Sequence, residues 1–343
     1  MNTLSKVIKN RVSLALVIMI CGHFTYAASP PAISAEEITK HQRFATWQGI
    51  EPDKWATIWL IKRHIVPEAY FLFVPPNHSL PKDALPFDVP EVAIRRAKGE
   101  SMFRRLTHAV QLHSPVIQYL YSIIHDIEVN IWDEPEHEHS PWFETMYRSL
   151  QARYQRDQVP VDCYLAFFDG VARLATQENV SADAYRNQLD LSILCPGLSQ
   201  EQSAMVESLN HLDVLREVSL GKRVVFVDTR ENEEYDEVHL PGAQLLRLRD
   251  VNQKNVKNLL SADLVVPYCV KDFRGFEVAK SLKQHGVKRV ATLSPNGLKG
   301  WLAADLPVAG KNQMDEQVAM TVLMQCAMEP SRCGILVPPR AVL

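Results

Sequence analysis

The chain of 343 residues is long enough for about two domains of ordinary size. Apolar residues make up 46% of it and charged residues 22%, close to the average of folded proteins, which excludes a disordered or low-complexity chain. The formal charge of −3 argues against a dedicated nucleic-acid-binding protein, which would carry a strongly basic surface.

The first 27 residues have the pattern of a secretory signal peptide. Three basic residues precede an apolar run over 12–22, and small side chains follow at Thr25 and Ala27. The run is too short to span a bilayer, which needs about 20 apolar residues. We therefore expect cleavage after Ala27, a periplasmic or secreted protein, and no membrane span after cleavage. An uncleaved membrane anchor is the alternative.

Residues from about 49 to 176 are expected to form a mostly helical domain. Apolar side chains recur there at helical spacing, and Pro115 should break or kink the longest run. Residues 74–90 are too rich in proline to form one helix. Helices are predicted at 54–65, 101–129, 146–155 and 163–175.

The pattern changes near Gly221. From there on, continuous runs of β-branched and aromatic residues, typical of buried parallel strands, alternate with helix-forming segments. Such alternation indicates an α/β domain with a central parallel sheet. Strands are predicted at 224–227, 244–248, 264–268 and 290–293, and helices at 276–285 and 314–328. The expected organisation is a leader over 1–27, a helical domain over 45–195, an α/β domain over 212–310 and a tail over 311–343.

A cysteine follows one of these strands directly. Cys269 comes after the strand at 264–268 and opens a loop that leads into a helix. Binding sites form at the carboxyl ends of parallel strands, and a helix N-terminus favours an anion. Lys271 and Arg274 add positive charge, which Asp272 partly opposes, so we expect a lowered thiol pKa and a nucleophilic Cys269. A buried structural cysteine is the alternative.

Two further motifs accompany this loop. One runs from Asp228 through Arg230 and an acidic stretch to His239-Leu-Pro-Gly-Ala, and the other covers 297–308. Together with the cysteine loop they resemble a rhodanese domain over about 212–309. Asp228, Arg230 and His239 are expected to support this fold rather than to contact substrate.

The resemblance implies that sulfane sulfur is carried as a persulfide on Cys269. Loop amides would stabilise the anionic sulfur, while Arg274 and Lys271 would bind an oxyanion donor such as thiosulfate. The loop departs from many active rhodaneses at Asp272, where Gly is common, and at Gly275, where Ser or Ala is common. The substrate-binding loop is expected to include Val270, Asp272, Phe273 and Gly275.

The first domain carries its own distinctive series. It contains Trp59-Leu-Ile-x-Arg, Pro67-Glu-Ala, Phe71-x-Phe-Val-Pro and Pro86-Phe-Asp. This series resembles the chromate-resistance exported protein family over about 51–175. The resemblance implies involvement in chromate resistance but supplies no mechanism. The chain departs from the family at Arg96, Ser101 and Glu128, where His, Cys and Asp are common.

Polar residues of this domain suggest two kinds of site. Arg63, His64 and Arg96 could hold an oxyanion by charge-assisted bonds, although ordinary solvated helix surfaces are the alternative. His125 and Glu128 lie i, i+3 on one helix and could supply two metal ligands, fewer than a metal site normally needs. The ligand-rich tract over 133–139 is expected to be a solvated loop.

Cleavage of the leader would leave five cysteines in an oxidising compartment, where disulfides persist. If Cys269 is the free thiol, the other four can form two disulfides. Cys326 and Cys333 could staple the tail, and Cys163 and Cys195 could then pair, but sequence cannot fix the connectivity. A resolving thiol for Cys269 is the alternative use of one of them.

These features favour an exported rhodanese-like sulfurtransferase linked to chromate or oxyanion resistance. Its expected partners are a small-molecule sulfur donor or oxyanion and a thiol acceptor, and no cofactor is expected. The alternative is a non-catalytic protein that binds or senses an oxyanion or metal and uses the rhodanese fold for recognition.

Overall fold

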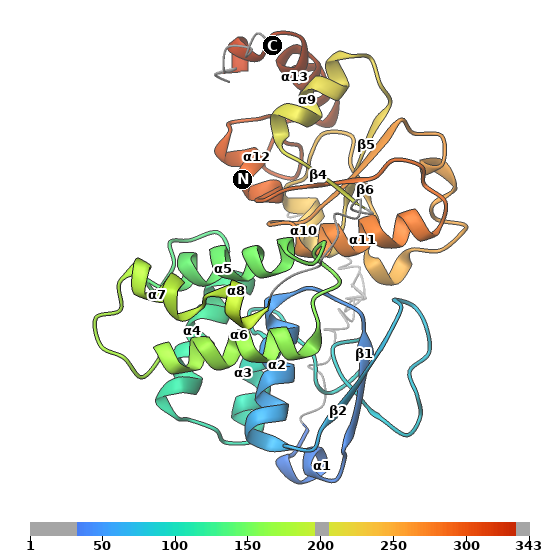
Figure 1. The fold of residues 1–343 in the computed structure, drawn as a ribbon. Helices are drawn as coiled ribbons and strands as arrows, with labels where there is room; N and C mark the ends of the chain where they lie inside the picture. Colours follow the sequence, from blue (N-terminus) through green and yellow to red (C-terminus); the bar gives the residue numbers. More distant parts are fainter. Residues whose placement is uncertain (1–32, 196–205, 334–343) are drawn as a thin grey trace, which may run out of the picture.

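The computed structural model describes residues 33–195 and 206–333 (Figure 1). The predicted leader and its cleavage site lie outside the described residues. No helix within those two ranges is both long and apolar enough to cross a membrane. The first domain contains α1 (Ala35–Thr39), β1 (Arg43–Trp47), α2 (Pro52–Leu60), β2 (Tyr70–Val74), β3 (Leu85–Pro86), α3 (Met102–Ala109), α4 (Pro115–Glu128), α5 (Ser140–Ala152), α6 (Val161–Leu174), α7 (Ala182–Gln188) and α8 (Leu191–Leu194).

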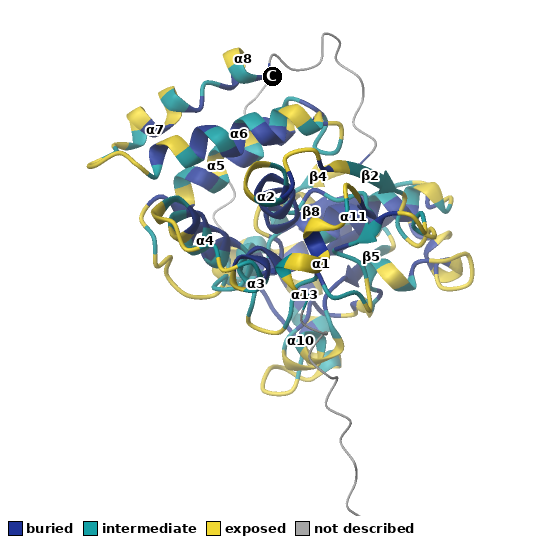
Figure 2. Ribbon diagram, turned by 90° about the horizontal axis from the view of Figure 1, so that it is seen from below, coloured by how far each residue is buried: buried dark blue, intermediate teal, exposed yellow. Residues whose placement is uncertain are grey.

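The first domain is built around α2, whose residues are all buried (Figure 2). Helices α3, α4 and α6 pack against it. A π-helical turn, Ile61–Ile65, extends α2. Pro115 begins α4, because a proline at the first helical position loses no hydrogen bond, and the predicted break at this residue is confirmed.

The helical character predicted for the first domain is confirmed, but the domain also contains a small parallel sheet. Its strand order is β2-β1-β3, with Phe44 of β1 opposite Phe71 of β2. This sheet is not predicted from the sequence, because short apolar runs do not distinguish a strand from a buried helical turn.

The second domain has the predicted α/β architecture. Strands β6, β5 and β7 pair in parallel in that order, β4 pairs with β8, and a bridge between Val265 and Val290 places β8 beside β7. Every residue of β7 is buried, as expected for a central parallel strand. The elements are β4 (Glu207–Leu209), α9 (His211–Ser219), β5 (Val224–Asp228), α10 (Asn232–Glu237), β6 (Gln244–Leu245), β7 (Leu264–Tyr268), α11 (Phe273–Gln284), β8 (Ala291–Leu293), α12 (Gly297–Ala303) and α13 (Glu316–Met328).

Helix α11 joins the two domains. It lies on the side of the second domain that faces the first (Figure 1), and Phe273 and Phe276 belong to a buried apolar cluster that also contains the core of the first domain. Polar contacts reinforce the junction: the amide of Ile50 donates to Glu277 at 2.7 Å, and Lys280 pairs with Asp157 at 2.6 Å. The helix that follows the cysteine loop is therefore held on both sides.

Both disulfides that the sequence left open are present. Cys163 at the start of α6 bonds to Cys195 after α8, and Cys326 on α13 bonds to Cys333. Cys269 is the free cysteine of the described residues. This arrangement matches the pairing expected if Cys269 is the unpaired thiol.

Candidate functional site

Cys269 lies at the carboxyl end of β7 and is only 4% exposed. The loop turns at once into α11, whose N-cap is Asp272. The backbone N–H groups of Arg274 and Gly275, at the start of α11, lower the pKa of the Cys269 thiol. The predicted placement of the thiol between a strand end and a helix N-terminus is therefore confirmed.

Gly275 allows this close approach of helix and strand. A Cβ at this position would lie 3.0 Å from the carbonyl oxygen of Pro267 and 3.0 Å from the Cα of Tyr268, both on β7. A Ser or Ala here would require the helix or the strand to shift. The departure from the usual rhodanese residue thus has a packing cause in this chain.

The cysteine loop is also fixed from α12. The amide of Leu298 donates to the carbonyl of Cys269 at 2.9 Å, and the amide of Lys299 donates to the carbonyl of Val270 at 2.9 Å. Gly297 makes these bonds possible, since it has a φ of +44° and a Cβ there would lie 1.7 Å from the carbonyl oxygen of Lys271. The first turn of α12 therefore packs directly on the loop backbone.

The expectation of a lowered thiol pKa is wrong for the structure as it stands. Burial raises the pKa of Cys269, and the charge of Asp272 raises it further, whereas Arg274 and the N–H groups of Arg274 and Gly275 lower it. Burial prevails because a thiolate loses its hydration on leaving water. Sequence position showed the helix N-terminus and the nearby cations but not the depth of the sulfur.

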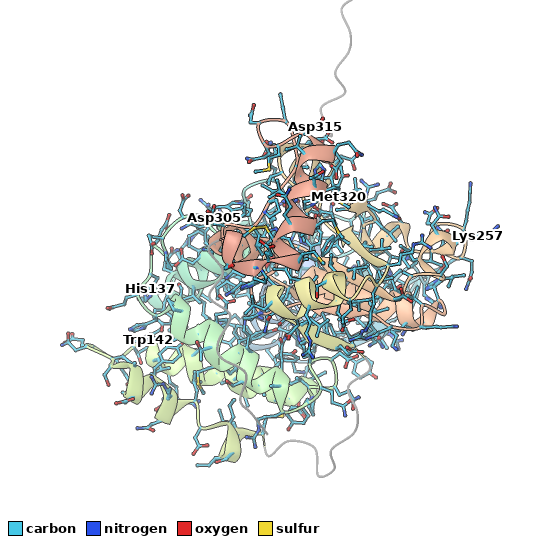
Figure 3. All side chains as sticks on the ribbon, turned by 90° about the horizontal axis from the view of Figure 1, so that it is seen from above. His137, Trp142, Lys257, Asp305, Asp315 and Met320 are labelled. Carbon is cyan, nitrogen blue, oxygen red and sulfur yellow. A yellow bond between two sulfur atoms is a disulfide. The ribbon has the colours of Figure 1, made fainter. Side chains whose placement is uncertain are left out.

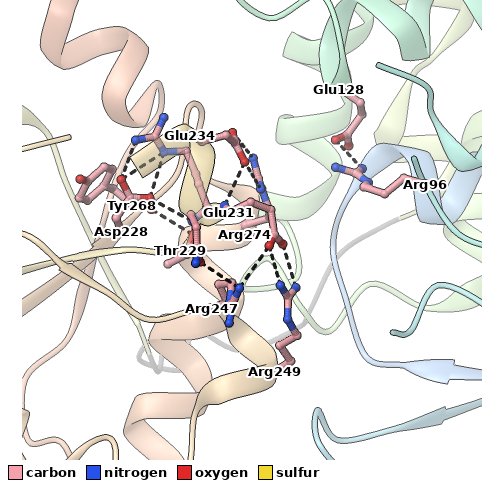
Figure 4. Close-up of polar contacts among 12 residues, drawn as sticks. Arg96, Glu128, Asp228, Thr229, Glu231, Glu234, Arg247, Arg249, Tyr268 and Arg274 are labelled. Carbon is pink, nitrogen blue, oxygen red and sulfur yellow. Dashed lines mark hydrogen bonds and ion pairs between the residues drawn. The ribbon is translucent and has the colours of Figure 1, made fainter. Parts of the chain in front are cut away.

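The two cations of the loop are both paired with carboxylates. Arg274 lies 3.3 Å from Glu234 on α10 (Figure 4), and Lys271 lies 2.6 Å from Glu144 on α5 of the first domain. Arg274 keeps a 29% exposed side chain, so it can still meet a small anion, whereas Lys271 is 12% exposed. The structure thus favours Arg274 over Lys271 as a donor-binding residue.

Asp272 is the loop residue most altered by its surroundings. Its side chain is fully buried, and it meets Arg148 at 2.6 Å and Arg156 at 3.0 Å, both from the first domain. The hydroxyl of Ser294 donates to the same carboxylate at 2.9 Å. The sequence predicts that the negative charge of Asp272 opposes the positive charge of the loop. In the fold, two arginines of the first domain compensate this negative charge.

Asp228, Arg230 and His239 support the fold. Arg230 is 1% exposed and pairs with Asp228 at 2.6 Å, which fixes the end of β5. His239 contacts the carbonyl of Tyr235 at 2.7 Å and Glu316 of α13 at 3.0 Å. These contacts agree with the structural roles that the sequence predicts for the three residues.

The three residues predicted to hold an oxyanion do not converge. Arg63 and His64 lie in the π-helical turn beyond the C-terminal end of α2, where Arg63 pairs with Asp169 at 2.8 Å. Arg96 lies near the other end of α2, where it meets Glu128 at 2.8 Å (Figure 4) and Asp53 at 3.6 Å. Burial lowers the pKa of the Arg274 guanidinium and the charge of Glu234 raises it above its usual value; Arg96 is close enough for its charge to lower that pKa slightly. It therefore belongs to the surroundings of the cysteine site, whereas Arg63 and His64 do not.

The structure does not support a metal site at His125 and Glu128. Glu128 is occupied by Arg96, and within 33–195 and 206–333 no three His, Cys, Asp or Glu side chains are grouped so as to hold a metal ion. The tract over 133–139 is mostly exposed, as expected of a solvated loop. His139 is the exception, since it is 7% exposed and stacks on Trp142. Figure 3 marks the position of this tract by His137 and that of the stacking partner by Trp142.

Sequence reasoning missed the residues that the first domain brings to the cysteine loop. Glu144, Arg148 and Arg156 lie more than a hundred positions before Cys269, and nothing in their local pattern distinguishes them from surface charges. Glu234 could have been found, because it stands in the acidic stretch of the rhodanese-like motif. The spatial pairing itself required the fold.

Comparisons with known families agree with this architecture. Residues 44–175 match the family model of the ChrB C-terminal domain, and residues 212–304 match the rhodanese-like domain. Among curated proteins, the chain is 26% identical over 103 residues to "Putative sulfur carrier protein YrkF" of Bacillus subtilis. That match covers 30% of this chain and 55% of the relative, so the chain spans about half the length of that protein.

Two solved structures are also similar. The BH2092 protein of Bacillus halodurans is 23% identical with a TM-score of 0.29, and the match covers 33% of this chain and 84% of that one. A thiosulfate sulfurtransferase of Pseudomonas aeruginosa is 12% identical with a TM-score of 0.28, and covers 89% and 75% respectively. The assignment of the two domains depends on the family models and not on these scores.

Proposed function

We propose, from its combination of a ChrB C-terminal domain with a rhodanese-like domain, that this protein is an exported sulfurtransferase that carries sulfane sulfur on Cys269. The observation that carries the proposal is the position of this free thiol. It stands at the carboxyl end of β7 and just before the N-terminus of α11, whose N–H groups at Arg274 and Gly275 lower the pKa of the thiol. Such N–H groups stabilise an anionic sulfur.

The chemistry consists of two transfers at one sulfur. The Cys269 thiolate attacks the outer sulfur of a thiosulfate-type donor; an S–S bond forms to the enzyme, the donor S–S bond breaks, and sulfite leaves with the electron pair. A nucleophile such as cyanide or a thiolate then attacks the terminal persulfide sulfur, and the Cys269 thiolate is released. Arg274 binds the departing oxyanion with its partly exposed guanidinium.

The burial of the thiol limits this reaction. Because burial raises the pKa of Cys269, the thiolate fraction is small at neutral pH and grows as pH rises. A sulfur that is 4% exposed also admits only a small, narrow group. We therefore expect a slow enzyme whose rate increases from neutral to alkaline pH.

Export and the link to chromate resistance are part of the same proposal. Two disulfides support an oxidising compartment, in agreement with the secretory pattern of the first 27 residues. The ChrB C-terminal match over 44–175 supports the link to chromate or related oxyanions.

The test is sulfur transfer from thiosulfate to cyanide by the full chain. We expect thiocyanate formation, a mass increase of one sulfur on the peptide that contains Cys269, and loss of both in Cys269→Ser. Cys163 and Cys195 provide an internal control, since their bonded sulfurs should gain nothing. Absence of thiocyanate and of the adduct from pH 6 to pH 10 would refute the proposal.

A non-catalytic role is the second candidate. It is favoured by the burial of Cys269, which leaves the residue 4% exposed and raises the pKa of its thiol, since both limit attack by the thiolate. A recognition module would bind chromate or thiosulfate without turnover. Calorimetric titration of chromate and of thiosulfate, with Arg274→Gln as the variant, measures this binding; binding without any thiocyanate formation in the sulfur-transfer assay would favour the non-catalytic role.

A further inference from the structure

The first domain holds the cysteine loop through one buried carboxylate. Asp272 is fully buried, and its two oxygens are divided between Arg148 at 2.6 Å and Arg156 at 3.0 Å. Arg148 comes from α5, and Arg156 from the turn that follows α5. An ionised carboxylate in this position requires compensation, because burying an unpaired charge is strongly unfavourable.

Both arginines are fixed by aromatic rings of α11. The guanidinium of Arg148 lies 4.5 Å from the ring centre of Phe273, and that of Arg156 lies 4.5 Å from the ring centre of Phe276. Each cation is thus held between the carboxylate and a ring of the helix that begins at the loop. Movement of the loop away from the first domain would break all of these contacts together.

The backbone beneath Arg156 is strained. Gln155 has a φ of +53° and Arg156 a φ of +73°, two successive non-glycine residues in the left-handed region. This conformation costs about 1 kcal/mol or more per residue and persists where surrounding contacts hold it. At Arg156, the side chain contacts Asp272 and Phe276, and the amide donates to the carbonyl of Gln151 at 2.8 Å.

Further charges complete the surroundings of the loop. From the first domain, Glu144 pairs with Arg148 at 2.8 Å and with Lys271 at 2.6 Å. From the second domain, Arg274 pairs with Glu234 at 3.3 Å, and the hydroxyl of Ser294 contacts Asp272. The cysteine loop is therefore surrounded by paired charges, of which those of Arg274 and Asp272 act on the Cys269 thiol.

We infer that Arg148 and Arg156 are positioning residues for Cys269: they hold Asp272, and through it the cysteine loop, in the conformation that transfers sulfur. This inference rests on the proposed function and deepens it, since it makes the reactivity of the rhodanese-like site depend on contact with the ChrB-type domain. An Asp at the fourth loop position, in place of the Gly common in rhodaneses, is the residue that provides this connection.

The test is a double-mutant cycle on the full chain with two readouts. Cys269 alkylation by iodoacetamide is followed by peptide mass from pH 6 to pH 10, and sulfur transfer is followed from thiosulfate to cyanide. Arg148→Gln leaves Asp272 less compensated, so we expect about tenfold slower alkylation at neutral pH, which corresponds to a midpoint about one unit higher. Asp272→Asn should shift the alkylation midpoint downward. In the double variant, alkylation should return to within about twofold of the original rate because the uncompensated charge is gone, whereas sulfur transfer should stay reduced because the contact that positions the loop is still broken.

A matched control comes from the first domain. Arg186→Gln removes an exposed arginine that pairs with Asp183, and it should change neither readout. A purely structural role of Arg148 would reduce sulfur transfer without moving the alkylation midpoint and without rescue by Asp272→Asn. An alkylation midpoint that does not move in Arg148→Gln, or alkylation that Asp272→Asn does not restore, would overturn the inference.

The two proposals fail in different ways. If the unmodified chain transfers sulfur but Arg148→Gln and Asp272→Asn leave the alkylation profile unchanged, positioning is wrong and the sulfurtransferase stands. If the chain transfers no sulfur but the cycle shifts alkylation as expected, the proposed reaction is wrong and the positioning stands. If Arg148→Gln does not fold, Asp272→Asn alone decides, since an unchanged midpoint refutes the inference.

Discussion

The contact between α12 and the cysteine loop gives the sharpest prediction. In Gly297→Ala, the new Cβ would lie 1.7 Å from the carbonyl oxygen of Lys271 and 2.4 Å from that of Cys269. Both are backbone atoms, so no side-chain rotation can relieve the overlap, and α12 must separate from the loop. The amides of Leu298 and Lys299 then lose their 2.9 Å hydrogen bonds to the loop carbonyls.

The expected cost follows from two contributions. Two lost hydrogen bonds cost about 2 kcal/mol together, and an alanine at a φ of +44° adds about 1 kcal/mol, so unfolding should become easier by about 3 kcal/mol. Sulfur transfer should fall at least tenfold, because the same carbonyls belong to the residues that shape the anion cradle. Urea unfolding and thiocyanate formation measure the two effects.

Gly221→Ala is the matched control. Gly221 has a φ of +73°, and a Cβ there would have nothing within 4 Å, so only the conformational cost of about 1 kcal/mol applies. An equal loss of stability in the two variants, or full sulfur transfer by Gly297→Ala, would refute the reasoning.

Two further predictions concern stability. Burial and the charge of Glu51 raise the pKa of Glu277 well above its usual value. The folded state therefore binds a proton that the unfolded chain releases. The free energy of unfolding falls as the pH rises above the pKa that Glu277 has in the unfolded chain. Glu277→Gln should therefore stabilise the protein by about 1–2 kcal/mol at pH 8, with a smaller gain at pH 5; a gain that is largest at pH 5 would contradict this. The two disulfides should differ in how much they stabilise the protein. Replacing Cys163 and Cys195 by serine opens a loop of 32 residues and should lower the free energy of unfolding by about 4 kcal/mol, whereas replacing Cys326 and Cys333 opens a loop of 7 and should lower it by about 2 kcal/mol, as measured by thermal unfolding. The opposite order would contradict the loop-length argument.

The parts of the site that are local in sequence could be predicted. A buried strand that ends in Cys269 and continues into a helix is one continuous segment, so the run of apolar residues over 264–268 was enough to place the thiol. The helix began three residues earlier than predicted, at Phe273, because its first turn is polar and aromatic in a pattern that sequence reads as a loop. The small sheet of the first domain could not be predicted, since β1 and β2 are short and pair only through the fold.

The roles of the departures from the rhodanese pattern could not be predicted either. The sequence predicts Gly275 as part of the substrate-binding loop and as a departure from the family, but the reason for a glycine is its close approach to Pro267 and Tyr268 on β7, which only the fold shows. Arg96 was grouped with Arg63 because both are basic, although α2 separates them. Packing distances decide such roles, and sequence does not contain them.

The charge at Cys269 shows most clearly why local reasoning failed. Within the loop, Lys271 and Arg274 outnumber Asp272, which suggests a positive site and an acidic thiol. In the fold, a glutamate pairs with each of these two cations, and two arginines of the first domain pair with Asp272. The added charges are two negative and two positive, so the net charge near the loop is unchanged, but every charge of the loop now has a partner. Paired charges largely cancel at the sulfur, and burial is then the strongest remaining influence on the pKa of Cys269. Reactivity at this thiol therefore depends on how firmly those pairs are held, and the strongest of them cross the junction between the two domains.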